Sequence, residues 1–204
     1  MTDTLETPST PSTSTPGTST PKDGVGLWTT VSTPDGAFTV VADTDGIILA
    51  SGWTDTPEYL VALVHRDLRP HDLRGPAELG RTPELTTITE AVEAYYADDF
   101  GPAAAQPVVQ RSGPFIEKAW AALRGVTAGT AVTYTELAER AGEPAAIRAA
   151  ASACARNAAA LFVPCHRVLR RDGSLGGFRY GLDIKRSLLD RETPDQEVPL
   201  PDAG

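Results

Sequence analysis

The sequence predicts an α+β protein: a small N-terminal three-stranded antiparallel sheet plus helices, followed by a mainly helical C-terminal domain with a helix-turn-helix. Between residues 27 and 53, three runs rich in β-branched and aromatic residues are separated by turn signals. From residue 84 onward, apolar residues at spacings of three and four become frequent. With 204 residues, 41% of them hydrophobic, the chain is long enough to bury a core.

The N-terminal strands come first. The runs LWTTVST, AFTVVA and GIILASGW are divided by turn residues at 34–36 and 43–46, a pattern typical of an antiparallel meander. Helices are then expected at about 58–66 and 84–100, the second with apolar residues along one face.

Three further helices are expected in the C-terminal domain. The run PFIEKAWAALRGV places its apolar residues along one stripe of a helix. A short helix at about 135–141, a turn at 142–144 and an alanine-rich helix that ends near 157 then follow. Two short helices around a glycine-containing turn are typical of a helix-turn-helix, and an ordinary helical hairpin is the alternative interpretation.

Composition divides the chain into five segments. Residues 1–23 are nearly all Thr, Ser, Pro, Asp and Gly, and we expect disorder because this composition cannot bury enough apolar surface. We expect an α/β domain at 24–104, a linker at 105–114, a catalytic domain at 115–192 and a disordered tail at 193–204.

Charge is unevenly distributed along the chain. The net charge of −9 alone argues against a nucleic-acid partner, because phosphate binding depends on clustered Lys and Arg. Residues 111–192, however, contain thirteen Lys or Arg and eight Asp or Glu, a net charge of +5, while the other residues carry −14. We therefore expect the basic part to contact DNA and the acidic part to face away from it.

Composition also argues against other classes of protein. No window approaches twenty apolar residues and the N-terminus has no signal-peptide pattern, so we expect a cytoplasmic protein without a membrane partner. The two cysteines, Cys154 and Cys165, lack CxxC spacing, which argues against a cysteine zinc site and a disulfide framework.

Cys165 lies between Pro164 and His166, at the end of an apolar run. One interpretation is a buried, inert thiol. The other is a nucleophile, because an adjacent imidazole can stabilise the reactive thiolate. A carboxylate that orients the imidazole would complete such a site, and sequence spacing leaves several downstream candidates open. Arg167 and its basic neighbours beside the thiol favour an anionic ligand, and we expect Arg167 to contact DNA.

The alanine-rich helix has few polar side chains for reading base edges. Its small residues, among them Ala149 and Ala150, would instead allow close approach to a sugar-phosphate backbone. We expect low sequence specificity from such a helix.

Four stretches of the C-terminal domain carry a resemblance to a known family. They are PFIEKAWAALRGVTAGTAVTYTELA, IRAAASACARN, VPCHRVLRRDGSLGGFRYGL and KRSLLDRE. In order and spacing they resemble the O6-alkylguanine-DNA alkyltransferases, and the FRYG loop is most similar to that of the bacterial Ada-type proteins. Residues 24–104 resemble the family only in outline, which implies a ribonuclease H-like N-terminal domain.

The resemblance implies roles for the matching residues. Cys165 is the alkyl acceptor, His166 is the base that deprotonates it through a water, and Glu192 orients His166. Tyr134 donates to the flipped guanine and helps rotate the nucleotide, and Arg148 fills the vacated place in the base stack.

Further roles concern the walls of the site. Asn157 braces the turn before the cysteine, and the carbonyls of Cys165 and Val168 accept from the exocyclic amine. Phe178 and Arg179 lie in the loop that limits substrate size, where this chain departs from many relatives.

The implied activity is direct-reversal DNA repair. The protein would flip O6-alkylguanine, with O4-alkylthymine as a further candidate, out of double-stranded DNA and transfer the alkyl group irreversibly to Cys165. It would act as a monomer, once per molecule, without a cofactor; no metal is expected, because the N-terminal domain offers only His65 and His71 as ligands. The alternatives are a lesion-binding relative without transfer activity and a Cys-His hydrolase.

Overall fold

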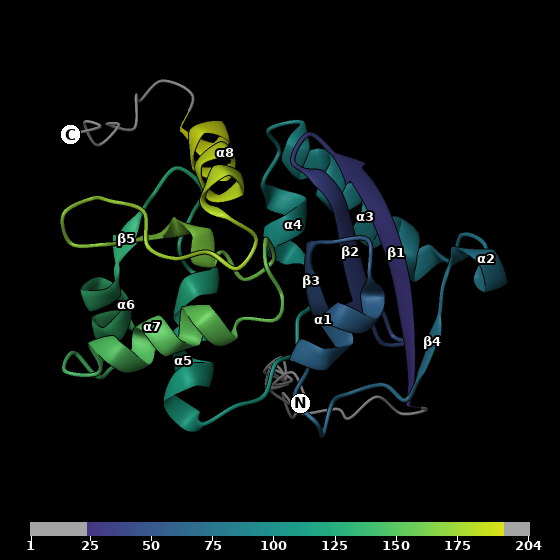
Figure 1. Cartoon of the computed structure of the whole chain (residues 1–204), viewed down its shortest axis with the longest axis horizontal. Coiled ribbons are helices and arrows are strands. Elements are labelled where there is room, and N and C mark those ends of the chain that lie inside the picture. Colours follow the sequence, from purple (N-terminus) through teal and green to yellow (C-terminus); the bar gives the residue numbers. More distant parts are fainter. Residues whose placement is uncertain (1–23, 194–204) are drawn as a thin grey trace, which may run out of the picture.

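The computed structural model describes residues 24–193. Residues 1–23 and 194–204, for which the sequence predicts disorder, lie outside the described residues. The described chain is a mixed α+β structure in which an antiparallel sheet with helices lies beside a mainly helical half (Figure 1). Within residues 24–193 no helix is long and apolar enough to cross a membrane.

The sheet is built on the predicted meander. Strands β1 (Val25–Thr33), β2 (Gly36–Ala42) and β3 (Ile48–Trp53) pair antiparallel in sequence order, which confirms that prediction. A fourth strand, β4 (Asp72–Arg74), pairs parallel with β1, so the sheet has the order β3-β2-β1-β4 and the predicted count of three is wrong. Three residues are too few to show an alternating pattern in sequence.

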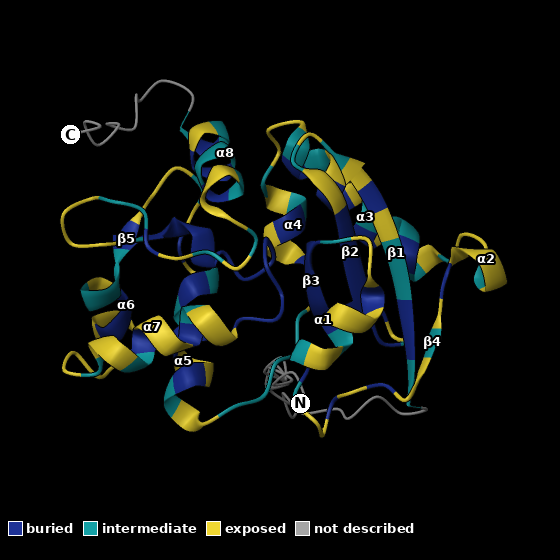
Figure 2. Ribbon diagram, in the orientation of Figure 1, coloured by how far each residue is buried: buried dark blue, intermediate teal, exposed yellow. Residues whose placement is uncertain are grey.

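Helices cover both faces of the sheet. Helix α1 (Pro57–Leu63) contacts β2 and β3, and α3 (Pro83–Tyr96) contacts β1 from the opposite side (Figure 1). Strand β3 is buried along its whole length, as Figure 2 shows. The short helix α2 (Pro76–Leu79) follows β4 at the edge.

The predicted helix at 84–100 is interrupted. Asp98 has φ 65°, in the left-handed region, so α3 stops at Tyr96 and α4 (Gly101–Ala105) begins separately. At its other end α3 is fixed by Thr82, whose side chain accepts from the backbone N–H of Leu85.

The C-terminal half contains four helices among the described residues. They are α5 (Pro114–Arg124), α6 (Tyr134–Arg140), α7 (Ile147–Arg156) and α8 (Leu182–Glu192). Helix α7 packs against α5 and α6. Strands β5 (Val132–Thr133) and β6 (Val168–Leu169) form a two-stranded parallel pair that the sequence did not indicate.

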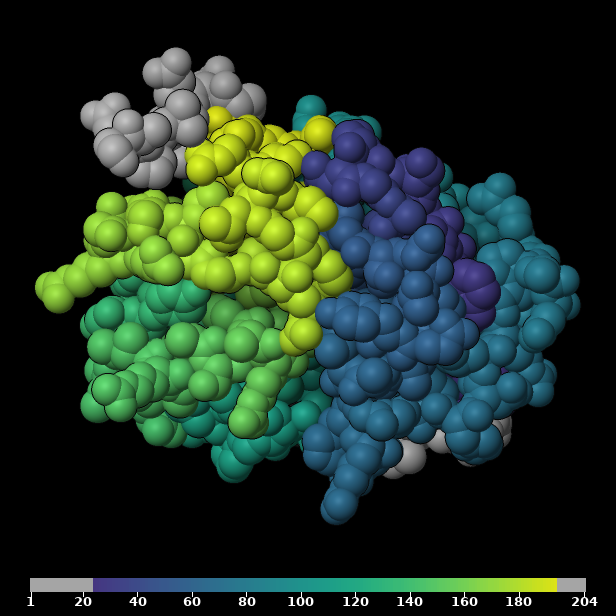
Figure 3. Space-filling view, viewed as in Figure 1, coloured from purple at the N-terminus to yellow at the C-terminus, as the bar shows by residue number. Residues whose placement is uncertain are grey.

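Strand β3 joins the two halves of the chain through backbone hydrogen bonds along its outer edge. Ile48 exchanges backbone hydrogen bonds with Pro107 and Val109, in the segment between α4 and α5. Ser51 bonds in the same way to Ala158 and Ala160, just before Cys165. One hydrophobic cluster continues from the sheet into α5 and α8, and the two halves meet without a gap on the face in Figure 3. The chain that leads to the cysteine is therefore held by the N-terminal sheet.

Candidate active site

Cys165 begins a short 3-10 turn (Cys165–Arg167) after a buried run of residues 157–164. Its side chain is buried, with 8% of the residue exposed. Leu161, in the run before it, has φ 74°, a conformation that a branched residue adopts only under constraint from its surroundings. Cys165 is thus carried by a tight, buried connection rather than by an exposed loop.

Asn157 lies at the C-terminal end of α7, and both the nitrogen and the oxygen of its side-chain amide form hydrogen bonds around this turn. Its Nδ2 donates to the carbonyl of Val163 at 2.7 Å and to Cys165 Sγ at 3.2 Å. Its Oδ1 accepts from the N–H of Ala159 at 3.1 Å and from Gln110 Nε2 at 2.9 Å. The predicted bracing role of Asn157 therefore has a geometric basis, and Asn157 also contacts the sulfur directly.

Burial raises the pKa of the Cys165 thiol. The hydrogen bond from Asn157 and the positive charges of Lys185 and Arg179 act in the opposite direction without cancelling the effect of burial. Cys165 therefore rests as a thiol at neutral pH, and a base must remove its proton before it can attack.

His166 is fully buried and forms a hydrogen bond through Nε2 to Glu192 Oε1 at 2.9 Å. A carboxylate can only accept, so Nε2 carries the proton and Nδ1 is the basic nitrogen. Among the described residues Nδ1 has no hydrogen-bond partner. Burial lowers the pKa of His166, against the opposing effect of Glu192, so the ring is neutral and able to accept a proton.

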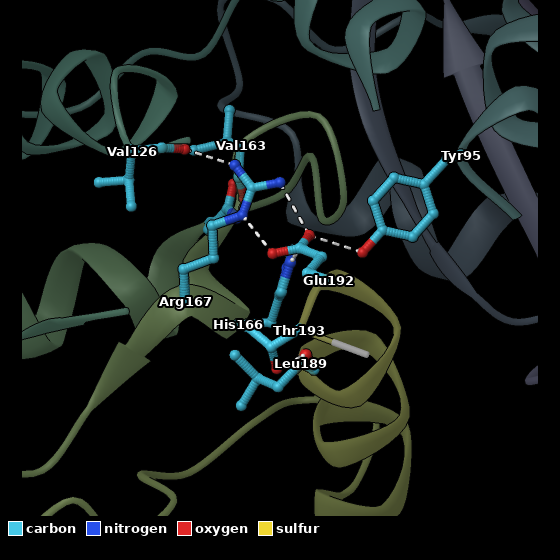
Figure 4. Close-up of polar contacts among 9 residues, drawn as sticks. Tyr95, Val126, Val163, His166, Arg167, Leu189, Glu192 and Thr193 are labelled. Atoms are coloured by element: carbon cyan, nitrogen blue, oxygen red, sulfur yellow. Dashed lines mark hydrogen bonds and ion pairs between the residues drawn. The ribbon is translucent and has the colours of Figure 1, made fainter. Parts of the chain in front are cut away.

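Glu192, at the end of α8, accepts from three side chains (Figure 4). Besides His166, Arg167 donates to Oε2 and Oε1 at 2.8 Å each, and Tyr95 Oη donates to Oε1 at 2.7 Å. Burial alone would raise the pKa of Glu192, but the hydrogen bonds from His166 and Arg167 and their charges outweigh it and hold the pKa at about 2. Glu192 is ionised at neutral pH and can stabilise a protonated His166.

The prediction that Arg167 contacts DNA is wrong in this structure. Only 6% of Arg167 is exposed, and its guanidinium binds Glu192 and the carbonyl of Val126 (Figure 4). The sequence places Arg167 among other basic residues, a pattern typical of a charged surface. It does not show that Arg167 pairs with a carboxylate 25 residues away.

A pocket of about 430 Å³ opens over Cys165. Its lining includes Tyr134, Cys154, Asn157, Phe178, Arg179 and Tyr180. Burial raises the pKa of Cys154, the second thiol in this pocket. The structure thus brings the predicted residues of the loop, the turn and the first short helix around one cavity.

Tyr134 is the first residue of α6 and is half-buried. Thr133 and Glu136 form a capping box around the first turn of α6, with hydrogen bonds of 3.2 and 2.6 Å. A Cβ atom on Gly176 would lie 2.3 Å from Tyr134 Oη, so only glycine leaves room for this hydroxyl beside the loop.

The far wall of the pocket rests on the N-terminal sheet. The ring of Trp53 lies 5.9 Å from that of Phe178 and 5.4 Å from that of Tyr180. Tyr180 Oη donates to the carbonyl of Ser51 at 3.2 Å. A Cβ atom on Gly52 would lie 1.9 Å from Tyr180 Oη. Sequence reasoning missed this contact, although a glycine inside a strand is a signal for close approach of another group.

Lys185 is a second residue that sequence reasoning missed. It is fully buried, and its Nζ donates to the carbonyls of Val168 at 2.6 Å and Gly176 at 3.3 Å. Burial lowers the pKa of Lys185. The carbonyl of Val168, predicted to accept from the guanine amine, therefore already accepts from Lys185 with one of its two lone pairs.

Helix α7 presents one exposed and one buried face. Arg148 is exposed, Ala149 is partly exposed, and Ala150 is completely buried. The prediction that the Ala150 side chain faces DNA is wrong, because it packs in the core with Ala153, whose carbonyl accepts from Trp120 Nε1 at 2.9 Å. Some small residues of α7 therefore pack against α5 and α6, and others lie on the outer surface.

No group of three or more His, Cys, Asp or Glu residues within positions 24–193 is placed to hold a metal ion. The side chains around Cys165 can instead donate hydrogen bonds, accept a proton and present a thiolate. Their arrangement suits nucleophilic attack on a ligand in the pocket.

Comparisons with known proteins agree with this arrangement. A family described as 6-O-methylguanine DNA methyltransferase, DNA binding domain, matches residues 114–194. A methylated-DNA–protein-cysteine methyltransferase of Mycobacterium leprae is 37% identical over 121 residues, which cover 57% of this chain and 72% of that protein.

Two further relatives extend the comparison. The bifunctional transcriptional activator/DNA repair enzyme Ada of Escherichia coli is 46% identical over 91 residues, 45% of this chain but only 26% of that protein. The crystal structure of Mycobacterium tuberculosis OGT in complex with DNA matches with a TM-score of 0.63 and 25% identity, covering 82% of this chain and 93% of that chain. The chain belongs to the methylated-DNA–protein-cysteine methyltransferase family.

Proposed function

We propose that this protein repairs DNA by transferring the alkyl group of O6-alkylguanine, and of O4-alkylthymine as a further candidate, to Cys165. The observation that carries the proposal is the position of Cys165 at a pocket of about 430 Å³, where Asn157 donates to its sulfur and the next residue, His166, is bonded to Glu192. Family membership supports the same reaction.

The reaction is a displacement at the alkyl carbon. The proton of Cys165 moves through a water to Nδ1 of His166, and Glu192 stabilises the resulting imidazolium. The sulfur attacks the alkyl carbon, an S–C bond forms and the C–O6 bond breaks. Tyr134 donates a hydrogen bond to the guanine ring, and the proton taken up by His166 passes through water to the departing base, so that the base leaves neutral. The thioether is stable, so each molecule reacts once.

The lesion must leave the duplex to reach this pocket, because O6 lies inside the base stack. We propose that α6 and α7 act as a helix-turn-helix, with the exposed Arg148 filling the gap left by the flipped nucleotide. The first backbone N–H groups of α7 have no side-chain cap, which favours a phosphate beside Arg148.

The proposal includes the organisation of the chain. The sheet and helices of residues 24–104 form the ribonuclease H-like domain, and residues 115–192 form the catalytic domain, joined by residues 105–114. The protein acts as a monomer in the bacterial cytoplasm and needs no cofactor.

The decisive experiment is the intact mass of the protein after incubation with duplex DNA that contains O6-methylguanine, followed by peptide mapping. We expect a gain of one methyl group, on Cys165, and none in Cys165→Ser. A folded, reduced protein that binds the lesion without gaining mass would identify a recognition protein instead. Hydrolysis of small substrates without DNA binding would identify a Cys-His hydrolase.

A further inference from the structure

Gln110 lies in the segment between α4 and α5, outside the catalytic helices. Its side chain nevertheless contacts both residues that begin the turn toward Cys165. Nε2 donates to Asn157 Oδ1 at 2.9 Å, and Oε1 accepts from the backbone N–H of Ala158 at 2.7 Å. A single amide therefore holds the turn at two consecutive positions.

The orientation of the Asn157 amide decides what the sulfur meets. With Nδ2 toward Cys165, the sulfur receives an N–H. After a half-turn of the amide, Oδ1 would face the sulfur and the carbonyl of Val163, both of which only accept when the cysteine is a thiolate. Donors on Oδ1 oppose this half-turn, and Gln110 is the side-chain donor among them.

The contact with Ala158 anchors Gln110 in this position. Ala158 is only 4% exposed, so its N–H would be buried without a partner if the glutamine were absent. On the other side of the turn, the carbonyl of Ala158 accepts from the N–H of Ser51 at 2.8 Å. The turn is therefore held between strand β3 and Gln110.

We propose that Gln110 is a positioning residue for the nucleophile: it fixes the Asn157 amide with its nitrogen toward Cys165 and pairs the N–H of Ala158. The proposal deepens the proposed function, on which it rests for its biological meaning. Reactivity of the thiol thus depends on the segment that joins the two halves of the chain.

The test is the pH dependence of Cys165 alkylation by iodoacetamide in the full chain, with peptide mapping to separate Cys165 from Cys154. Loss of a well-placed hydrogen bond to a thiolate corresponds to about one pH unit, or about tenfold in rate below the midpoint. We expect a shift of this size to higher pH in Gln110→Ala. Asn157→Ala sets the upper limit of the shift.

Two variants separate positioning from general stability. Gln110→Glu can still accept from Ala158 but cannot donate to Asn157, so we expect it to fold and to show the upward shift. Gln106→Ala removes a glutamine of the same segment whose side-chain amide, among the described residues, bonds to the carbonyl of Pro102 and not to Asn157 or Ala158, and we expect the wild-type profile.

The outcomes are distinct. An upward shift in both Gln110 variants, with the Gln106 control unchanged, supports the proposal. A lower melting temperature with an unshifted Cys165 profile in both Gln110 variants would show a purely structural role and overturn it. Because iodoacetamide needs no DNA, the result holds even if the protein fails to accept methyl groups from DNA, and that failure would count against the proposed function alone.

Discussion

Tyr95→Phe tests whether the N-terminal half stabilises the charge of the buried carboxylate of Glu192. Tyr95 is 1% exposed, and its hydroxyl donates to Glu192 Oε1 at 2.7 Å (Figure 4). Burial and the charge of Glu192 raise the pKa of Tyr95, so the hydroxyl keeps its proton and acts as donor. The substitution removes this oxygen and leaves the aromatic ring in the core.

The expected loss follows from the type of bond. A hydrogen bond to a charged group contributes about 1.5–3 kcal/mol. For a chain of this size, 1 kcal/mol corresponds to about 2–4 °C in melting temperature, so we expect a decrease of about 3–12 °C at neutral pH. Glu192 keeps its contacts with His166 and Arg167, which limits the loss to this range.

The pH dependence supplies a second measure. The pKa of Glu192 is lowered from 4.5 to about 2, so its contribution to stability is complete above about pH 4.5 and is lost as the pH falls toward 2. Tyr95 favours the charged form of Glu192. Its removal raises the folded-state pKa of Glu192 toward the unfolded value, so the acid decline in stability should be smaller and should end at a higher pH.

The assay is thermal unfolding from pH 7.5 to pH 3, with Tyr96→Phe as the matched control. Tyr96 is the next residue on α3, and its hydroxyl donates to Asp35 and accepts from Trp53 instead of contacting Glu192. Both hydroxyls donate to a carboxylate, but only the carboxylate of Glu192 is buried, so we expect the larger change in the acid decline in Tyr95→Phe. If Tyr95→Phe unfolds as the wild type does at every pH, the bond to Glu192 contributes nothing and this reasoning is refuted.

Two further predictions concern the pocket and the DNA surface. Gly52→Ala would place a Cβ 1.9 Å from Tyr180 Oη, so we expect a loss of about 1–3 kcal/mol in urea unfolding, and an unchanged midpoint would contradict the close packing. Arg148→Ala removes an exposed side chain. We expect an unchanged melting temperature. Relative to the wild type, the rate of methyl transfer should fall more on duplex than on single-stranded DNA, since only the duplex needs a residue to fill the stack. An equal change in rate on both substrates would argue against that role.

The sequence predicts the parts of the fold that depend on local patterns. The β-rich runs of β1, β2 and β3 and the turn residues between them specify the meander. The end of α3 was misplaced because the left-handed conformation of Asp98 does not follow from its residue type. Strand β4 and the pairing of residues 107–109 with β3 depend on contacts between distant segments, which local periodicity does not report.

The site was predictable where the motif itself carries the chemistry. Cys165, His166 and Glu192 were assigned by resemblance, and the structure brings His166 and Glu192 into contact. Residue type alone did not predict which side chains are buried. Arg167 is an ordinary surface residue by type, yet here it is an internal partner of Glu192, and Ala150 is small enough for either face of its helix.

Sequence reasoning also placed all the chemistry in the C-terminal domain, and the contacts argue otherwise. Residues before α5 reach three separate parts of the site: Tyr95 bonds the carboxylate, Gln110 bonds the asparagine beside the sulfur, and Trp53 packs against the loop over the pocket. Each of them acts through a residue that the motif contains. Strong similarity in the C-terminal domain therefore does not make that domain self-sufficient, because the groups that keep its charges and amides in position come from the less similar half of the chain.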